Sequence, residues 1–172
     1  MRTLPRHTKP SAQNACSPSI EIRPSKIHGQ GVFARRTLRA GQHVGEYTGR
    51  LYAADQEDDI WDGELTYLFG LSDGSTIDGA QGGNETRQLN HACAPNVEAV
   101  ERRRPDGSLS LTVRTLQRIQ AGDELFLDYA LVIAKSQLPS DYPCRCAMHG
   151  CRGTMAAHRA SLGVACKLLA AP

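Results

Sequence analysis

Apolar and polar residues alternate over short stretches of this chain, which is the pattern of half-buried β-strands. Turn-forming residues, glycine above all, separate these stretches. The pair Asp73-Gly74 lies between two such stretches and is typical of a hairpin turn. The expected strands are residues 20–23, 32–34, 44–47, 67–71, 75–77, 97–101, 109–115 and 124–129.

Helical patterns are few and short. Residues 53–61 are polar and acidic with helical character, and residues 84–89 predict a brief helix. Residues 155–169 would form either a terminal helix or a loose tail. The sequence therefore predicts a mainly β fold with short helices, and it contains no internal repeat.

The size and composition of the chain suit one domain with tails, since it has 172 residues. Aliphatic side chains must form most of the core, because aromatic residues make up only 5% of the chain. No apolar run is long enough to cross a membrane, so we expect no membrane partner. Residues 1–19 lack the apolar stretch of a signal peptide and are rich in Pro, Ser, Thr and basic residues, which predicts a disordered lead-in.

Six cysteines in a chain without a secretion signal indicate reduced thiols and metal binding rather than disulfides. We therefore expect an intracellular protein, cytoplasmic if the source is bacterial and located in a host nucleus if it is a secreted effector. Cys16 and Cys166 have no partner at a useful spacing, and the sequence assigns them no role.

A cluster of three cysteines is the strongest chemical feature of the chain. Cys144, Cys146 and Cys151 follow a C-x-C-x4-C pattern. Because a structural zinc site needs four ligands, the cluster requires one more. Cys93 is the best candidate. His149 is the alternative, although its place between Cys146 and Cys151 makes simultaneous coordination sterically awkward.

The net charge of +2 hides a segregation of charge along the chain. No Lys or Arg occurs between Arg50 and Arg87, and that stretch holds nine of the 18 acidic residues. Such a stretch could attract a basic partner, but on charge alone a solvated acidic face is the simpler explanation. No basic stripe with interleaved aromatic residues predicts direct nucleic-acid binding.

A second polar motif, Asn90-His91-Ala92-Cys93-Ala94-Pro95-Asn96, places two amides, an imidazole and a thiol within seven residues. Burying these polar groups costs free energy unless they are hydrogen-bonded or take part in function, which favours a functional site. A polar loop whose Asn side chains cap backbone groups explains the motif equally well. Tyr129 and Tyr47 at strand ends, and Gly29-Gln30-Gly31 in a turn, have ordinary structural explanations when each is taken alone.

Taken in order, these features resemble the SET-domain protein-lysine methyltransferases over residues 20–153, with a post-SET zinc segment. Leu127 departs from the family pattern, in which an aromatic residue usually stands two positions before the tyrosine. The segments that carry the resemblance are Gly29-Gln30-Gly31-Val32-Phe33-Ala34, Glu46-Tyr47-Thr48-Gly49, Arg87 to Asn96, Gly122 to Tyr129, and the cluster of Cys144, Cys146 and Cys151.

The resemblance implies a SET-domain, β-clip-like fold of small curved sheets, in which the Asn-His segment and the last strand form a C-terminal pseudoknot. It divides the chain into the lead-in at 1–19, a SET domain at 20–133 with an acidic insert at about 51–66, a post-SET zinc segment at 140–156, and a tail or short helix at 157–172. It also implies S-adenosyl-L-methionine as the methyl donor and a structural Zn2+ ion.

The resemblance further assigns roles to individual residues. Catalysis would involve Tyr129, Tyr47 and Tyr67, and the position of Leu127 would tune how many methyl groups are added. The remaining residues are the cofactor-binding set, His28, Gly29, Gln30, Arg87, Asn90 and His91, and the metal-binding set, Cys93, Cys144, Cys146 and Cys151.

The expected function is therefore methylation of a lysine in a basic, histone-tail-like peptide or protein by a monomeric enzyme. A small aliphatic residue at Leu127 leaves room for di- or trimethylation. The alternatives are a non-catalytic SET-like module that binds basic tails, and a zinc-bearing adaptor. An adaptor for nucleic acid is disfavoured by the acidic middle of the chain and by the lack of stacking aromatic residues.

Overall fold

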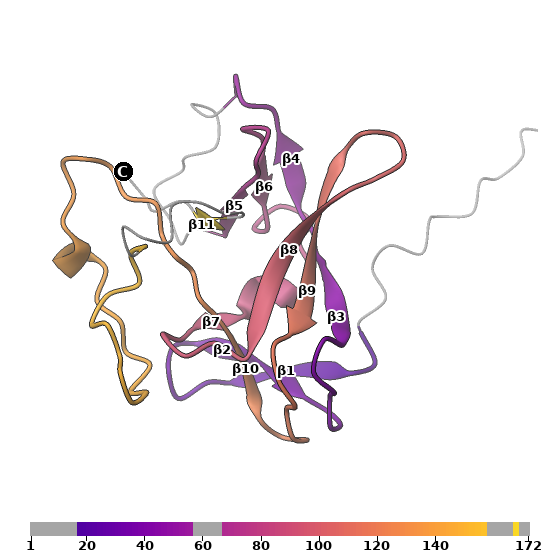
Figure 1. Cartoon of the computed structure of the whole chain (residues 1–172), viewed down its shortest axis with the longest axis vertical. Helices are drawn as coiled ribbons and strands as arrows, with labels where there is room; N and C mark the ends of the chain where they lie inside the picture. Colours follow the sequence, from indigo (N-terminus) through magenta and orange to yellow (C-terminus); the bar gives the residue numbers. More distant parts are fainter. Residues whose placement is uncertain (1–16, 57–66, 158–166, 169–172) are drawn as a thin grey trace, which may run out of the picture.

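A computed structural model describes residues 17–56, 67–157 and 167–168. These residues form three small sheets and very little helix (Figure 1), so the expectation of a mainly β fold with short helices is confirmed. The strands are β1 (Ile20–Pro24), β2 (Gln30–Ala34), β3 (His43–Tyr47), β4 (Arg50–Tyr52), β5 (Leu68–Gly70), β6 (Thr76–Asp78), β7 (Asn90–His91), β8 (Val97–Arg103), β9 (Leu109–Thr115), β10 (Glu124–Leu127) and β11 (Lys167–Leu168).

The first sheet has the order β1-β2-β10-β7 and joins the two most distinctive sequence motifs. β10 pairs antiparallel with β2 and parallel with β7, where Phe126 lies opposite Asn90 and Leu127 opposite His91. The last long strand and the Asn-His segment therefore lie side by side, as the resemblance implied. A parallel pair of this kind needs a long connection, and residues between β7 and β10 supply it through β8 and β9.

The second sheet has the order β3-β9-β8 and contributes about a third of the residues of the hydrophobic core. β8 and β9 form a long hairpin of seven paired residues, visible at the centre of Figure 1. Gly107 at its tip has a φ of 86°, a backbone conformation that favours glycine. The fully buried side chains of this core are mainly aliphatic, in keeping with the low aromatic content of the chain.

The third sheet has the order β11-β5-β6-β4. Its β5–β6 hairpin turns at Gly74 with a φ of 85°, which confirms the hairpin expected at Asp73-Gly74. The short helix expected at residues 84–89 is the 3-10 helix η2 (Glu85–Gln88), capped by the Asn84 side chain. Strands β4, β7 and β11 have two or three residues each, too short for an alternating pattern to reveal.

The two segments for which a helix is expected, alone or as an alternative to a loose tail, are not helical in the residues that the structure describes. Residues 53–56 form a turn, and the rest of the segment 53–61 lies outside the described part of the chain. Residues 155–157 are not helical, and Lys167–Leu168, within the segment expected to be a tail or short helix, pairs with β5 as a strand. A strand of two residues is defined by its partner in the sheet, and local sequence does not reveal that partner.

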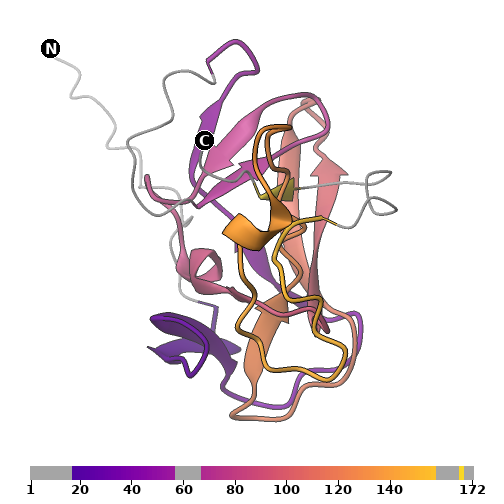
Figure 2. The ribbon, with the colours of Figure 1, turned by 90° about the vertical axis from the view of Figure 1, so that its left-hand side faces the viewer.

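The segment after β10 folds back along the first sheet (Figures 1 and 2) and contains the short 3-10 helix η3 (Pro139–Asp141). Two isolated bridges close it, one between Leu131 and Ala156 and one between Pro143 and Thr154. This segment carries three of the six cysteines to the end of β7. Among the residues that the structure describes, we find no helix of the length and apolarity that a membrane span requires.

Candidate functional site

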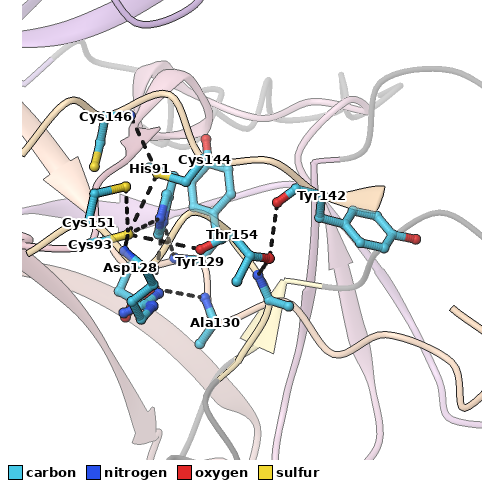
Figure 3. A network of polar contacts seen from close by, with 12 residues as sticks. His91, Cys93, Asp128, Tyr129, Ala130, Tyr142, Cys144, Cys146, Cys151 and Thr154 are labelled. Carbon is cyan, nitrogen blue, oxygen red and sulfur yellow. Dashed lines mark hydrogen bonds and ion pairs between the residues drawn. The ribbon is translucent and has the colours of Figure 1, made fainter. Parts of the chain in front are cut away.

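Four cysteine side chains converge beside the end of β7 (Figure 3). The sulfur atoms of Cys93, Cys144, Cys146 and Cys151 all lie within 4.8 Å of one another. The Cys93 sulfur is 3.6 Å from that of Cys144 and 3.8 Å from that of Cys151. A tetrahedral zinc ion with bonds of about 2.3 Å would hold its sulfur ligands roughly 3.8 Å apart. The spacing therefore fits a closed, structural zinc site.

Backbone N–H groups point at these sulfurs and favour the thiolate form that binds a metal ion. The N–H groups of Cys146 and Gly153 point at the sulfurs of Cys144 and Cys151, each at 3.4 Å. Burial raises the pKa of the Cys93 and Cys144 thiols, so a metal ion must displace their protons on binding. Among the described residues the ligand group contains Cys93 and not His149, which leaves the first alternative as the one with suitable geometry.

The side-chain amide of Asn90 holds the turn before β2 in place. Its Nδ2 donates to the carbonyl oxygens of His28 and Gln30 at 3.2 and 3.0 Å, and to Oε1 of Glu124 at 2.9 Å. A Cβ atom on Gly31 would lie 2.1 Å from that Glu124 oxygen, so only glycine leaves room for this contact. The structure thus brings the expected cofactor-binding turn, His28 to Gln30, next to Asn90.

His91 and Tyr129 meet at the junction of β7 and β10. The backbone N–H of Tyr129 donates to Nδ1 of His91 at 3.1 Å, and the two rings lie 5.3 Å apart. Burial lowers the pKa of His91 to about 4, so its imidazole is neutral at pH 7. Because Nδ1 accepts a hydrogen bond, the ring proton resides on Nε2, which lies 3.4 Å from the Cys93 sulfur.

The phenols of Tyr47, Tyr67 and Tyr129 gather on the other side of this junction. The Tyr129 hydroxyl donates to the Leu89 carbonyl oxygen and the Tyr47 hydroxyl to that of Tyr67, both at 2.7 Å. Burial raises the pKa of Tyr129 and of Tyr47, and the nearby Tyr67 phenol raises both further. All three expected tyrosines therefore lie close together, and the phenols of Tyr47 and Tyr129 are neutral.

Arg87 and Leu127 flank this group of phenols. The guanidinium of Arg87 donates to the Gly79 carbonyl oxygen at 3.2 Å and lies 5.8 Å from the centre of the Tyr67 ring. Leu127 is buried in the hydrophobic core and is paired with His91 across β10 and β7. Every expected catalytic and cofactor-binding residue thus belongs to one connected region around β7 and β10.

Sequence reasoning missed three residues of this region. Glu124 anchors Asn90, while Asp128 and Arg152 form an ion pair with nitrogen–oxygen distances of 2.8 and 2.7 Å. The sequence shows Glu124 and Asp128 as members of a strand motif and Arg152 as the residue after the last clustered cysteine, and it assigns none of them a contact. No local pattern signals a contact between residues 24 positions apart, so these partners emerge from the tertiary structure.

Comparison with known proteins places the region in context. A family model described as the SET domain matches residues 29–130. The chain is 33% identical over 156 residues to "Histone-lysine N-methyltransferase 2B" of Homo sapiens, which covers 86% of this chain and 5% of that protein. It is 37% identical over 118 residues to "Histone-lysine N-methyltransferase MEDEA" of Arabidopsis thaliana, which covers 64% of this chain and 16% of that protein. The chain therefore spans only a small part of these relatives.

A solved structure has the same fold. It is described as ctPRC2 in an autoinhibited conformation bound to S-adenosylmethionine, and it matches with a TM-score of 0.57 at 27% sequence identity. The match covers 64% of this chain and 15% of that chain. The small-sheet architecture of this chain is therefore shared, over about two thirds of its length, with that structure.

Proposed function

The chain belongs to the SET domain family, and we propose that it is an S-adenosylmethionine-dependent protein-lysine N-methyltransferase. The observation that carries this proposal is the meeting of the neutral Tyr129 phenol with the Asn90–His91 strand and with two further phenols. The names of the two curated relatives and the cofactor named for the structural neighbour support the same reaction.

The cofactor-binding role falls to the turn from His28 to Gln30, to Arg87 and to the Asn90–His91 pair. When bound, S-adenosylmethionine supplies an electrophilic methyl group on a sulfonium sulfur. Asn90 serves this site by holding the turn, because its amide donates to the carbonyl oxygens of His28 and Gln30. Gly31 and Glu124 keep that amide in place.

The phenols would receive and orient the substrate amine. A free lysine has a pKa near 10.4, so its amine must lose a proton before it can attack a methyl carbon. Tyr129 does not serve as the base, because burial raises its pKa and its proton is donated to the Leu89 carbonyl oxygen. Solvent can carry the proton away, while the lone pairs of Tyr129 orient the reacting groups. Alignment then supplies most of the acceleration, up to roughly 7–11 kcal/mol in favourable cases.

Zinc has a structural role in this proposal. Four thiolate ligands leave no open position for water or substrate, so the metal does not take part in the chemistry. The ion would hold residues 140–156 against the end of β7. The reduced thiols that this requires support an intracellular location, which we include in the proposal.

The proposed substrate is a lysine in a basic, histone-tail-like peptide or protein. Supporting this, every charged Asp, Glu, Lys or Arg side chain between Arg50 and Arg87 is acidic. Of the described acidic residues in this stretch, Asp55 and Asp73 are exposed, Glu85 is half-buried and Asp78 is buried. Hydrogen bonds from Ser75 lower the pKa of Asp73, which therefore stays charged. We propose a monomer that binds this substrate directly, without nucleic acid or membrane.

The test uses zinc-replete protein, labelled S-adenosylmethionine, and core histones with a total bacterial lysate as substrates. Tyr129→Phe should reduce the transfer of label to protein by about 100-fold or more, because it removes an orienting oxygen from the site. Tyr142→Phe is the matched control, since Figure 3 shows its ring pointing away from His91 and Tyr129; it should retain transfer.

The outcomes separate the candidate functions. Transfer by the wild type that is lost in Tyr129→Phe and kept in Tyr142→Phe supports a lysine methyltransferase. Cofactor binding without transfer means that the substrate mixture lacks the right protein. Failure to bind the cofactor as well would contradict the proposal and favour a non-catalytic module that binds basic tails.

A further inference from the structure

Two chains of contacts lead from the metal site to the backbone of Tyr129 (Figure 3). The first runs through His91, whose Nδ1 accepts the Tyr129 N–H at 3.1 Å and whose Nε2 lies 3.4 Å from the Cys93 sulfur. His91 is almost fully buried, so this path is shielded from solvent.

The second chain runs through Arg152. Its backbone N–H points at the Cys93 sulfur at 3.4 Å. Its guanidinium binds both carboxylate oxygens of Asp128 at 2.8 and 2.7 Å, the forked geometry that makes an arginine–carboxylate pair directional. The side chains of Arg152 and Asp128 are only 27% and 32% exposed, which limits competition from water.

Asp128 connects the Arg152 guanidinium to the backbone that follows Tyr129. Its Oδ1 accepts a hydrogen bond from the Ala130 N–H at 3.1 Å. Ala130 has a φ of 42°, a left-handed conformation that an alanine adopts only when its surroundings enforce it. The backbone just after Tyr129 is therefore strained, and the carboxylate held by Arg152 is one of the groups that keep it so.

We propose that Arg152 is a positioning residue for Tyr129, and that docking of the zinc segment sets the backbone of Tyr129 through the Arg152–Asp128 pair. This rests on the proposed function for its effect on methyl transfer. Residues 140–156 then do more than carry three of the zinc ligands, because they hold residues 128–130 in the conformation that aims the Tyr129 phenol.

A simpler role for Arg152 would be to fasten the zinc segment and nothing more. In that case its loss would weaken the attachment of the zinc segment, and neither the rate at saturating cofactor nor the exchange of the Tyr129 amide in the zinc-loaded protein would change. A positioning role instead lowers kcat at saturating cofactor, and it loosens the Tyr129 amide while the metal stays bound. These readouts separate the two roles.

The decisive experiment is residue-resolved amide hydrogen exchange by nuclear magnetic resonance on the zinc-loaded protein. In Arg152→Met, whose zinc content is checked to equal that of the wild type, the Tyr129 and Ala130 amides should exchange roughly tenfold faster. Amides of the β8–β9 hairpin should not change, which shows that the fold is intact. Arg152→Lys keeps the charge without the fork and should give an intermediate rate.

Arg145→Met is the matched control. Arg145 lies between Cys144 and Cys146, is exposed, and forms no hydrogen bond or ion pair with the described residues. Its loss should leave the exchange of the Tyr129 amide as in the wild type. If Arg152→Met folds poorly, Arg152→Lys decides the question, since any positioning role still requires faster exchange at Tyr129.

Kinetics then test the link to catalysis. In zinc-loaded Arg152→Met, kcat should fall roughly tenfold, because a small displacement of the Tyr129 phenol weakens the alignment of the reacting groups, with little change in the KM for S-adenosylmethionine. Unchanged exchange at Tyr129, or a change in KM alone, overturns the proposal. A wild type that neither binds the cofactor nor transfers a methyl group would instead count against the proposed function, while the exchange comparison would still judge Arg152.

Discussion

Asn96 and Phe126 are joined by a hydrogen bond of 2.7 Å from the backbone N–H of Phe126 to Oδ1 of Asn96. The same side chain donates through Nδ2 to the carbonyl oxygen of Glu124 at 2.8 Å. One side-chain amide therefore pairs with β10 as a peptide group of a neighbouring strand would. This pairing joins the segment after β7 to the strand that leads to Tyr129.

Replacing Asn96 by alanine should lower the free energy of unfolding by about 2–3 kcal/mol, because two partly buried backbone groups lose their partners. Urea unfolding measures this directly. Gln88→Ala is a suitable control, since that side chain is half-buried without a hydrogen bond to the described residues, and it should change stability by less than about 0.5 kcal/mol. Equal effects of the two changes would contradict the role given to Asn96.

The buried Tyr47 hydroxyl should make stability sensitive to alkaline pH. Burial raises the pKa of Tyr47 above that of an unfolded tyrosine, which is near 10. Below pH 10 the Tyr47 phenol keeps its proton in both the folded and the unfolded protein, and above pH 10 only the unfolded protein readily loses it. Native stability therefore falls as the pH rises past 10.

Tyr47→Phe isolates this contribution. At pH 8 the variant should be about 1 kcal/mol less stable, because it loses the hydrogen bond to the Tyr67 carbonyl oxygen. Above pH 10 the difference in the free energy of unfolding between variant and wild type should shrink, because the variant lacks the ionisable phenol. Urea unfolding from pH 8 to 11 tests this, and a difference that stays constant over that range would count against it.

Gly31→Ala should weaken cofactor binding about tenfold. The added methyl group would lie 2.1 Å from Glu124 Oε1 and 3.1 Å from Asn90 Nδ2. Glu124 must then move, which frees the Asn90 amide and loosens the turn from His28 to Gln30. Calorimetric titration with S-adenosylmethionine measures the change. Gly45→Ala, whose methyl group would meet the nearest atom at 3.4 Å, should bind as the wild type does.

The cysteine cluster should bind one zinc ion per chain. Cys93→Ser replaces one of four thiolates by a weaker donor, so zinc should be released to a chromogenic chelator at least roughly tenfold faster. Cys16→Ser should release zinc at the wild-type rate, since Cys16 has no partner at metal-binding spacing. Similar release from both variants would show that Cys93 is not a ligand.

Leu127 should permit more than one methyl group on the substrate lysine. An aliphatic side chain leaves room and removes a hydroxyl that could hold water beside the amine. We expect mass spectra of the wild-type product to contain di- or trimethyl-lysine, Leu127→Tyr to shift it towards monomethyl-lysine, and Leu127→Met, of similar volume, to change little. A wild-type product containing only monomethyl-lysine would contradict this expectation.

Much of the site could be anticipated because its members lie in contiguous motifs. Asn90, His91 and Cys93 lie within four residues, and three of the clustered cysteines lie within eight. Glu124, Asp128 and Arg152 could not be assigned roles in the same way, because each acts on a residue distant in sequence. The left-handed backbone at Ala130 was equally hidden, since alanine itself gives no sign of such a conformation.

The sequence by itself determined most of the strand pattern, the hairpin at Gly74 and the cluster of Cys144, Cys146 and Cys151, because these follow from local alternation, turn chemistry and residue spacing. Only the tertiary structure decided the pairing of β10 with β7, the strand at Lys167–Leu168 and the Arg152–Asp128 contact. Pairing between distant segments is stabilised by contacts that exist only after the chain has folded. Local sequence therefore limits which partners can meet, and packing of the whole chain selects among them.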